Sequence, residues 1–164
     1  MEPRIQYAKT EDGVSIAYYV IGNGKPLVNT PGGTMTHIQL EWRTPQRRDF
    51  HSALAEGRSL IRYDGRGAGL SDENVEPLSL ETCLLDLDAV VDALQIERFA
   101  LLAPAFIGPP AIAYAARNPE RVSEQILWCT SARNVEVVSS PGNRALGALR
   151  DADWHPIHGG CSVH

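Results

Sequence analysis

Cysteine is scarce in this sequence, with three residues (Cys83, Cys129 and Cys161) in a chain of 164. An odd number at such wide spacing is not the framework of a disulfide-rich domain, and we expect a protein of the reducing cytoplasm. Long apolar runs are also missing, because no run approaches the roughly 18 residues that span a bilayer. The first residues have no apolar stretch typical of a secretory signal. We therefore expect neither export nor a membrane partner.

Positive charge is in the minority, with 15 Lys and Arg against 20 Asp and Glu and a formal net charge of −5. This balance argues against nucleic acid as a main partner. Hydrophobic residues make up 43% and charged residues 21%, which is close to the globular average and excludes wholesale disorder. A chain of this length is typical of one domain with a real core.

Short β-branched and aromatic runs alternate with stretches of helical periodicity. We expect strands near residues 5–9, 14–20, 26–29, 59–63, 99–102 and 121–129, the first two paired antiparallel. We expect helices near residues 46–56 and 111–117, and one capped by Ser79 that carries Leu80, Leu84, Leu87, Val91 and Leu94 on one face. This alternation predicts an α/β fold with a mostly parallel sheet of about six strands, flanked by helices.

Three segments then match a known family in order and spacing. They are a Gly-Gly turn at Gly32 and Gly33, the loop Tyr63-Asp-Gly-Arg-Gly-Ala-Gly-Leu-Ser71, and the segment Ala113-Tyr-Ala-Ala-Arg-Asn-Pro-Glu-Arg-Val122. Together they resemble the α/β-hydrolase superfamily. The phrase His37-Ile-Gln-Leu-Glu-Trp42 is similar to the branch fused to nucleotide cyclases or to helix-turn-helix regulators. The resemblance implies that residues 1–154 are the N-terminal part of a hydrolase domain and that residues 155–164 form an unstructured tail.

The same resemblance implies a nucleophilic serine in a G-x-S-x-G turn after the fifth strand. At the corresponding positions this sequence has Ala103, Ala105 and Ile107, and no Ser, Cys, Asp or Thr occurs between residues 101 and 110. An alanine methyl cannot attack a carbonyl carbon. The acid and histidine of the family follow later strands that we do not find, so we expect no serine-hydrolase chemistry.

Other family positions still predict a pocket. The resemblance places the backbone N–H groups of Gly32 and Gly33 in oxyanion geometry, and donors without a nucleophile make at most a binding site. His37 and Phe106 are candidates for the pocket wall. An acid–base role for His37 is the catalytic alternative, although a lone loop histidine is more often structural. No cofactor is expected.

Two further patterns invite other interpretations. The loop of residues 64–69 is rich in glycine, but it matches neither of the phosphate-binding patterns G-x-x-x-x-G-K-[ST] and G-x-G-x-x-G. We therefore expect a tight structural loop in which Arg66 bonds to Asp64 or to a nearby carbonyl. Near the C-terminus, His155, His158, Cys161 and His164 are weak candidates for a zinc or copper site, because these ligand types suit both metals.

The leading hypothesis is an α/β-hydrolase-fold protein without serine-hydrolase activity, either a truncated product or a binding or sensing module. Its expected partners are a small apolar or ester-like ligand and, through an exposed sheet edge, a second copy. The alternative is an ester hydrolase acting on a carboxylic ester or similar small substrate, of which this sequence is a fragment. A metal-binding tail is the third hypothesis.

Overall fold

A computed structural model describes residues 2–32, 36–73, 75 and 79–132. The possible helix within residues 141–154, the domain boundary at residue 154 and the four candidate metal ligands of the tail lie outside the described residues, as does Gly33. Among the helices within these ranges, α3 is the longest at 14 residues, and none is long and apolar enough to cross a membrane.

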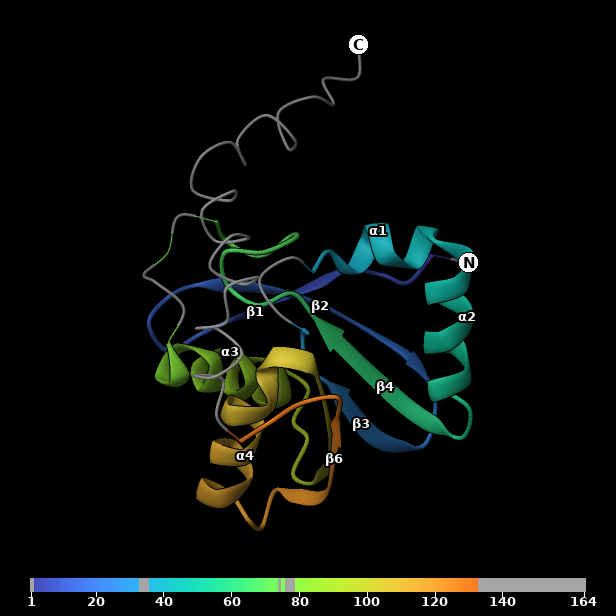
Figure 1. Ribbon diagram of the computed structural model, residues 1–164. Helices are drawn as coiled ribbons and strands as arrows, with labels where there is room; N and C mark the ends of the chain where they lie inside the picture. The colour runs from blue at the N-terminus through green and yellow to red at the C-terminus, as the bar shows by residue number, and fades with distance from the viewer. Residues whose placement is uncertain (1, 33–35, 74, 76–78, 133–164) are drawn as a thin grey trace, which may run out of the picture. The chain divides into compact units, whose positions relative to one another are not determined.

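Six strands form one sheet, as the sequence predicts (Figure 1). They are β1 (Gln6–Lys9), β2 (Ser15–Gly22), β3 (Lys25–Asn29), β4 (Arg58–Tyr63), β5 (Phe99–Pro104) and β6 (Val122–Trp128). Their order is β1-β2-β4-β3-β5-β6. The β1–β2 and β2–β4 pairs are antiparallel and the remaining pairs are parallel, which confirms the expected antiparallel start.

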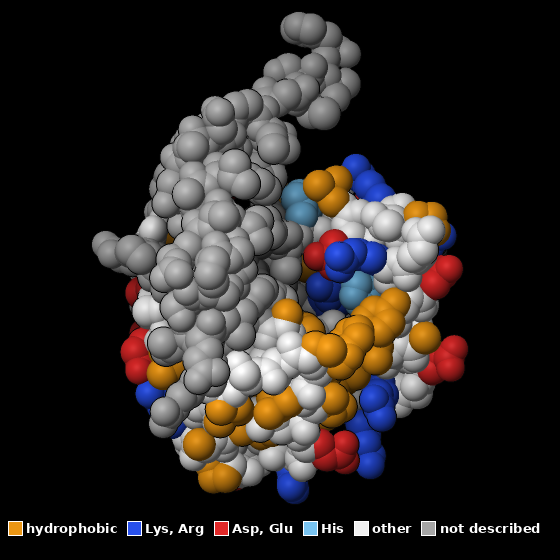
Figure 2. All heavy atoms as spheres, viewed as in Figure 1, with side chains coloured by type: hydrophobic (Ala, Val, Ile, Leu, Met, Phe, Trp, Pro, Cys, Tyr) orange, Lys and Arg blue, Asp and Glu red, His pale blue; other side chains and the backbone are white. Residues whose placement is uncertain are grey.

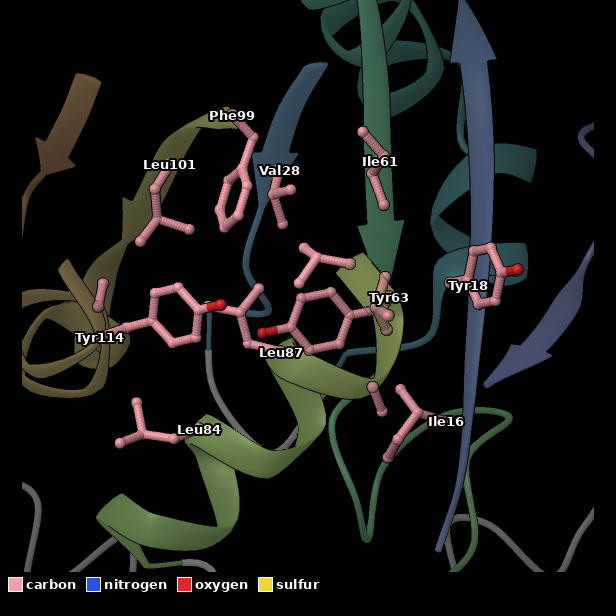
Figure 3. Packing of buried hydrophobic residues seen from close by; sticks show 14 of the residues in the cluster. Ile16, Tyr18, Val28, Ile61, Tyr63, Leu84, Leu87, Phe99, Leu101 and Tyr114 are labelled. Atoms are coloured by element: carbon pink, nitrogen blue, oxygen red, sulfur yellow. The ribbon is translucent and has the colours of Figure 1, made fainter. Parts of the chain in front are cut away.

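The larger part of the core lies between the sheet and two helices, α3 (Leu80–Ala93) and α4 (Gly108–Arg117). Figure 3 shows Leu84, Leu87 and Tyr114 from the helices against Val28 and Leu101 from the strands. Leu84, Leu87 and Val91 of the predicted apolar stripe are buried and Leu94 packs against the core, whereas Leu80, the first residue of the helix, is 39% exposed. The predicted stripe is therefore the buried face of α3 beyond its first residue. Ser79 caps this helix as predicted, and a capping box with Thr82 reinforces the cap.

The opposite face of the sheet is covered by α1 (Ile38–Arg43) and α2 (Pro45–Leu54), which connect β3 to β4. Because side chains alternate along a strand, Leu60 packs toward this face while its neighbour Ile61 packs into the larger core. Ile38 of α1 is fully buried against Ala17 and Tyr19. Two short helices thus separate this side of the sheet from solvent.

The loop after β4 is a tight structural loop, as expected. The carboxylate of Asp64 accepts backbone N–H bonds from Ile38 at 3.0 Å and Leu70 at 3.0 Å. Ser71 donates its hydroxyl to the Asp64 carbonyl at 2.6 Å. Gly69 has a φ of +56°, and a Cβ there would collide with the Asp64 carboxylate. Only glycine fits this turn.

The predicted partner of Arg66 is wrong. Its guanidinium Nε donates to Asp86 of α3 at 2.9 Å, and Nη1 donates to Asp12 in the β1–β2 turn at 2.7 Å. Asp64 is unavailable because backbone N–H groups already occupy its carboxylate. Arg66 therefore ties the Gly-rich loop to two elements that are distant in sequence.

Candidate functional site

The strand order reverses at β3, whose two neighbours are β4 and β5. Ligands of open α/β sheets bind at the carboxyl ends of strands at such a switch point. Thr30 fixes this end of β3, because its backbone N–H and its hydroxyl both donate to the carbonyl of Leu102, at 3.0 and 3.1 Å. A cavity of about 600 Å³ lies at this point of the sheet.

The cavity reaches the turn where the sequence predicts the missing nucleophile. Ala105 follows β5 directly, begins a short 3-10 helix and lines the cavity together with Pro104. Its φ is +54°, a left-handed conformation that residues with a Cβ avoid. Ile107 is buried in the main core. The chain therefore keeps a strained strand-to-helix turn but presents a methyl group there.

A buried polar cluster forms another part of the wall. Arg62 of β4 is 4% exposed, and its Nη1 donates to the carboxylate of Glu41 at 2.8 Å. The same Nη1 lies 3.4 Å from Nδ1 of His51. Arg47, at the rim of the cluster, lies 3.6 Å from Glu41. One carboxylate is thus shared by two guanidinium groups.

Burial and neighbouring charge set the ionisation of this cluster. Burial and, after it, the positive charge of Arg62 lower the pKa of His51 to about 4, so the imidazole is neutral at pH 7. Burial raises the pKa of Glu41, but the charge and hydrogen bond of Arg62, together with the charge of Arg47, outweigh burial and lower the pKa of that carboxyl. Glu41 is therefore an anion and His51 a neutral acceptor.

Aromatic and aliphatic side chains form the apolar wall. Phe50 of α2 and Trp128 at the end of β6 lie with ring centroids 5.8 Å apart, and Leu102 of β5 is part of the same wall. Both rings remain partly open to solvent, at 41% and 52% exposure. Figure 2 shows a hollow in which blue and pale blue side chains lie beside orange ones. The cavity is amphipathic.

The structure separates the predicted site residues. Gly32 lines the cavity, whereas Gly33 and the side chain of Phe106 lie outside what the structure describes. His37 is not among the lining residues, and its Nδ1 accepts the N–H of Leu40 at 3.4 Å, which caps α1. This contact gives His37 a structural role.

Metal-binding geometry is not found in the part of the chain that the structure describes, where no three His, Cys, Asp or Glu side chains cluster suitably. Cys83 and Cys129 are both free thiols. Burial raises the pKa of Cys83 to about 11, which keeps it a protonated, unreactive thiol at neutral pH.

Sequence reasoning missed Glu41, His51 and Arg62. Glu41 lies within the phrase of residues 37–42, but no motif links the three residues, because they come from three elements and meet only in the fold. The one available signal is the alternation in β4, where Arg62 stands between the buried residues Ile61 and Tyr63. Because successive side chains of a strand face opposite sides of the sheet, the pattern predicts an exposed Arg62. The side chain is buried instead, because α1 and α2 cover that face.

No family model matches the sequence. The chain is 29% identical over 126 residues to the AB hydrolase superfamily protein YisY of Bacillus subtilis, covering 77% of this chain and 45% of that protein. It is 30% identical over 127 residues to the cis-3-alkyl-4-alkyloxetan-2-one decarboxylase of Shewanella oneidensis, covering 75% and 38%. The chain thus spans less than half the length of both curated relatives.

The chain spans little more than half the length of two solved structures that it resembles. A hydrolase from Pseudomonas aeruginosa is 26% identical with a TM-score of 0.72, over 96% of this chain and 57% of that one. A carboxylesterase structure from Nitrososphaera gargenis, at 20% identity and a TM-score of 0.73, covers 90% and 54% and shows the fold alone.

Proposed function

Starting from an α/β-hydrolase fold, and from relatives that support a place in the α/β-hydrolase superfamily, we propose that this chain binds a small ligand without hydrolysing it. The observation that carries the proposal is Ala105. It occupies the strained turn beside the cavity, where covalent acyl transfer needs an oxygen or sulfur nucleophile. A methyl group has no lone pair to donate.

The cavity itself supports the proposal that this chain binds a small ligand. Its volume of about 600 Å³ lies within the usual range of small-molecule sites. Gly32 lies on its wall, as expected of a loop that presents backbone donors to a carbonyl oxygen. Loss of the nucleophile leaves such a pocket intact.

For the ligand we propose a small, largely apolar, ester-like molecule. Phe50, Leu102 and Trp128 offer apolar surface to an alkyl chain. The Shewanella relative is named for an oxetan-2-one, a cyclic ester that carries two alkyl groups. We further propose that the chain serves as a sensing module in the cytoplasm, in keeping with the fused branch that residues 37–42 resemble.

The fragment hypothesis, in which these residues belong to an active ester hydrolase, rests on a different observation: the relatives are much longer than this chain. Ala105 distinguishes binding without turnover from the fragment hypothesis. A longer chain would supply an acid and a histidine, but the residue at position 105 would still be alanine. We therefore favour binding without turnover.

The experiment combines a turnover assay with a binding assay on the full chain. We expect no hydrolysis of p-nitrophenyl butyrate above the background of heat-unfolded chain, and no labelling by a fluorophosphonate probe. Ala105→Ser should remain inactive, because a serine without its histidine loses about as much rate as removal of the whole triad. Saturable esterase activity that survives repurification would contradict the proposal.

Binding is measured by calorimetry with methyl hexanoate. Trp128→Ala should weaken it, because the indole forms part of the apolar wall, whereas Tyr7→Ala should not. Tyr7 is a matched control, since it is an exposed aromatic residue on β1 at the other edge of the sheet. Equal affinity of both variants would place the ligand elsewhere.

A further inference from the structure

We propose that the cluster of Glu41, His51 and Arg62 makes this cavity a site for the carboxylate of a small monocarboxylic acid. The inference rests on the proposed ligand-binding function and adds the charge of the ligand to it. It is carried by a buried donor of Arg62 that has no partner among the described residues, by the balance of charge around the cavity and by the adjoining apolar wall.

The first observation is an unused donor. Arg62 uses Nη1 for Glu41 and His51, but its buried Nε finds no hydrogen-bond partner among the described residues. Native structures leave few such atoms unpaired, and a bound polar ligand is one way to satisfy them.

The second observation is charge. The titratable side chains that line the cavity are Glu41, Arg47, His51 and Arg62. Since His51 is neutral at pH 7, two guanidinium groups face one carboxylate, and one positive charge is left uncompensated. A monoanion balances this charge. A dianion such as phosphate would be repelled by Glu41, which already occupies one side of Arg62.

The third observation is geometry. A guanidinium is planar and presents its donors in a fork that matches the two oxygens of a carboxylate. Phe50 and Trp128 then offer apolar surface beside this charged end. A short alkyl acid fits both parts of the site, with its carboxylate at Arg62 and its chain along the two rings.

The test compares hexanoate with methyl hexanoate, which has a similar chain without the charge, by calorimetry on the full chain at pH 7.5. We expect hexanoate to bind about tenfold more tightly, because only the acid brings a negative charge and two equivalent oxygens to the guanidinium. The double variant Arg62→Met with Glu41→Gln should abolish this preference. Changing both residues avoids an unpaired buried carboxylate, which would destabilise the fold.

A matched control removes a guanidinium–carboxylate pair of helix α2 that lies outside the cavity. Arg48 and Asp49 of α2 lie 3.9 Å apart and are absent from the lining. The double variant Arg48→Met with Asp49→Asn should keep the full preference for hexanoate. Loss of the preference in this control as well would overturn the proposal, because a general change in surface charge would then explain it.

A second readout uses the unmodified chain. The charge of Arg62 lowers the pKa of His51, so a carboxylate bound at Arg62 should raise that pKa in an NMR titration. Methyl hexanoate should leave it unchanged. Equal affinity for acid and ester with no shift at His51 would overturn the carboxylate site and leave the proposed binding function standing. Failure of both compounds to bind would remove the binding function as well.

Discussion

Ala105 adopts a left-handed backbone conformation, with a φ of +54°, immediately after a buried strand. For a residue with a Cβ this conformation costs about 1–2 kcal/mol. Strain of this kind persists where the surrounding structure determines it, commonly at functional sites. Here Pro104 and the core residue Ile107 flank the turn.

The strain can be measured directly. Ala105→Gly should raise the free energy of unfolding by about 0.5–1 kcal/mol, because relief of the left-handed strain exceeds the entropy that glycine adds to the unfolded chain. Urea denaturation monitored by circular dichroism measures the change. In the control Ala115→Gly, within helix α4, the same substitution should destabilise by about 1 kcal/mol. A destabilised Ala105→Gly would show that the turn carries no strain.

His51 makes the stability depend on pH. The unfolded imidazole gains a proton near its ordinary pKa of 6.5, whereas the buried imidazole stays neutral down to about pH 4. The unfolded state thus binds more protons between these values, so acidification destabilises the fold. The contribution is fully present above pH 6.5 and amounts to about 3 kcal/mol at most.

Urea denaturation at pH 7, 6 and 5 tests this expectation. Wild type should lose stability over the series, and His51→Gln should lose less, because glutamine does not titrate. His37→Gln serves as the control for a histidine outside the cluster. A slope that is identical in wild type and His51→Gln would show that other groups account for the pH dependence.

At the scale of elements, α3 illustrates where sequence patterns suffice. Its cap and its boundaries near Ser79 and Leu94 agree with the prediction, and so does its apolar stripe except at Leu80, which is exposed. Ser79→Ala should reduce the free energy of unfolding by about 1 kcal/mol, because the N–H of Thr82 loses its acceptor. Ser52→Ala, at an exposed interior position of α2, should leave stability unchanged or slightly raise it. An equal loss in both would argue against the cap.

Two other elements show where patterns fail. Helix α1 was not predicted, because its six residues are too few to establish a helical period. Helix α4 begins at Gly108 rather than near residue 111, since its two prolines lie in the first turn, where no intrahelical N–H is needed. Without the fold, the same prolines indicate a loop.

The candidate site, like the helices, is only partly predictable from the sequence. The resemblance and its spacing assign Ala105 to the nucleophile position, and this assignment stays a prediction. The structure shows a left-handed backbone at this residue. The cluster around Arg62 depends on which face of β4 is covered, and only the packing of α1 and α2 decides that. Contacts between elements that are distant in sequence were beyond prediction for this reason.

At the scale of the whole molecule, β6 is one of the two edge strands of the sheet that the described residues form. Its residues Ile126, Leu127 and Trp128 are all exposed, and no other described strand pairs with its outer side. Unpaired strand edges with apolar side chains recruit further chains. We therefore propose that this edge drives self-association.

Light scattering after size exclusion, over a range of concentrations, tests this proposal. Ile126→Lys should shift the chain toward monomer, because a charge on an edge strand disfavours pairing. Glu124→Lys is the matched control, since it places the same side chain two residues away without removing apolar surface, and it should leave the association largely unchanged. A wild-type chain that stays monomeric at high concentration would refute the edge as an interface.

The strand order also has a consequence for synthesis. Strand β3 does not pair with β2, which immediately precedes it, but lies between β4 and β5. Thr30, just beyond its end, bonds to a carbonyl 72 residues later in the chain. Leu27 and Val28, both fully buried in the finished fold, therefore emerge from the ribosome long before β5, the second of their two partner strands. Such non-local pairing slows folding. A growing chain that has reached α3 contains β4 beside β3 but still leaves the other edge of β3 open, and this interval is when a chaperone would bind it.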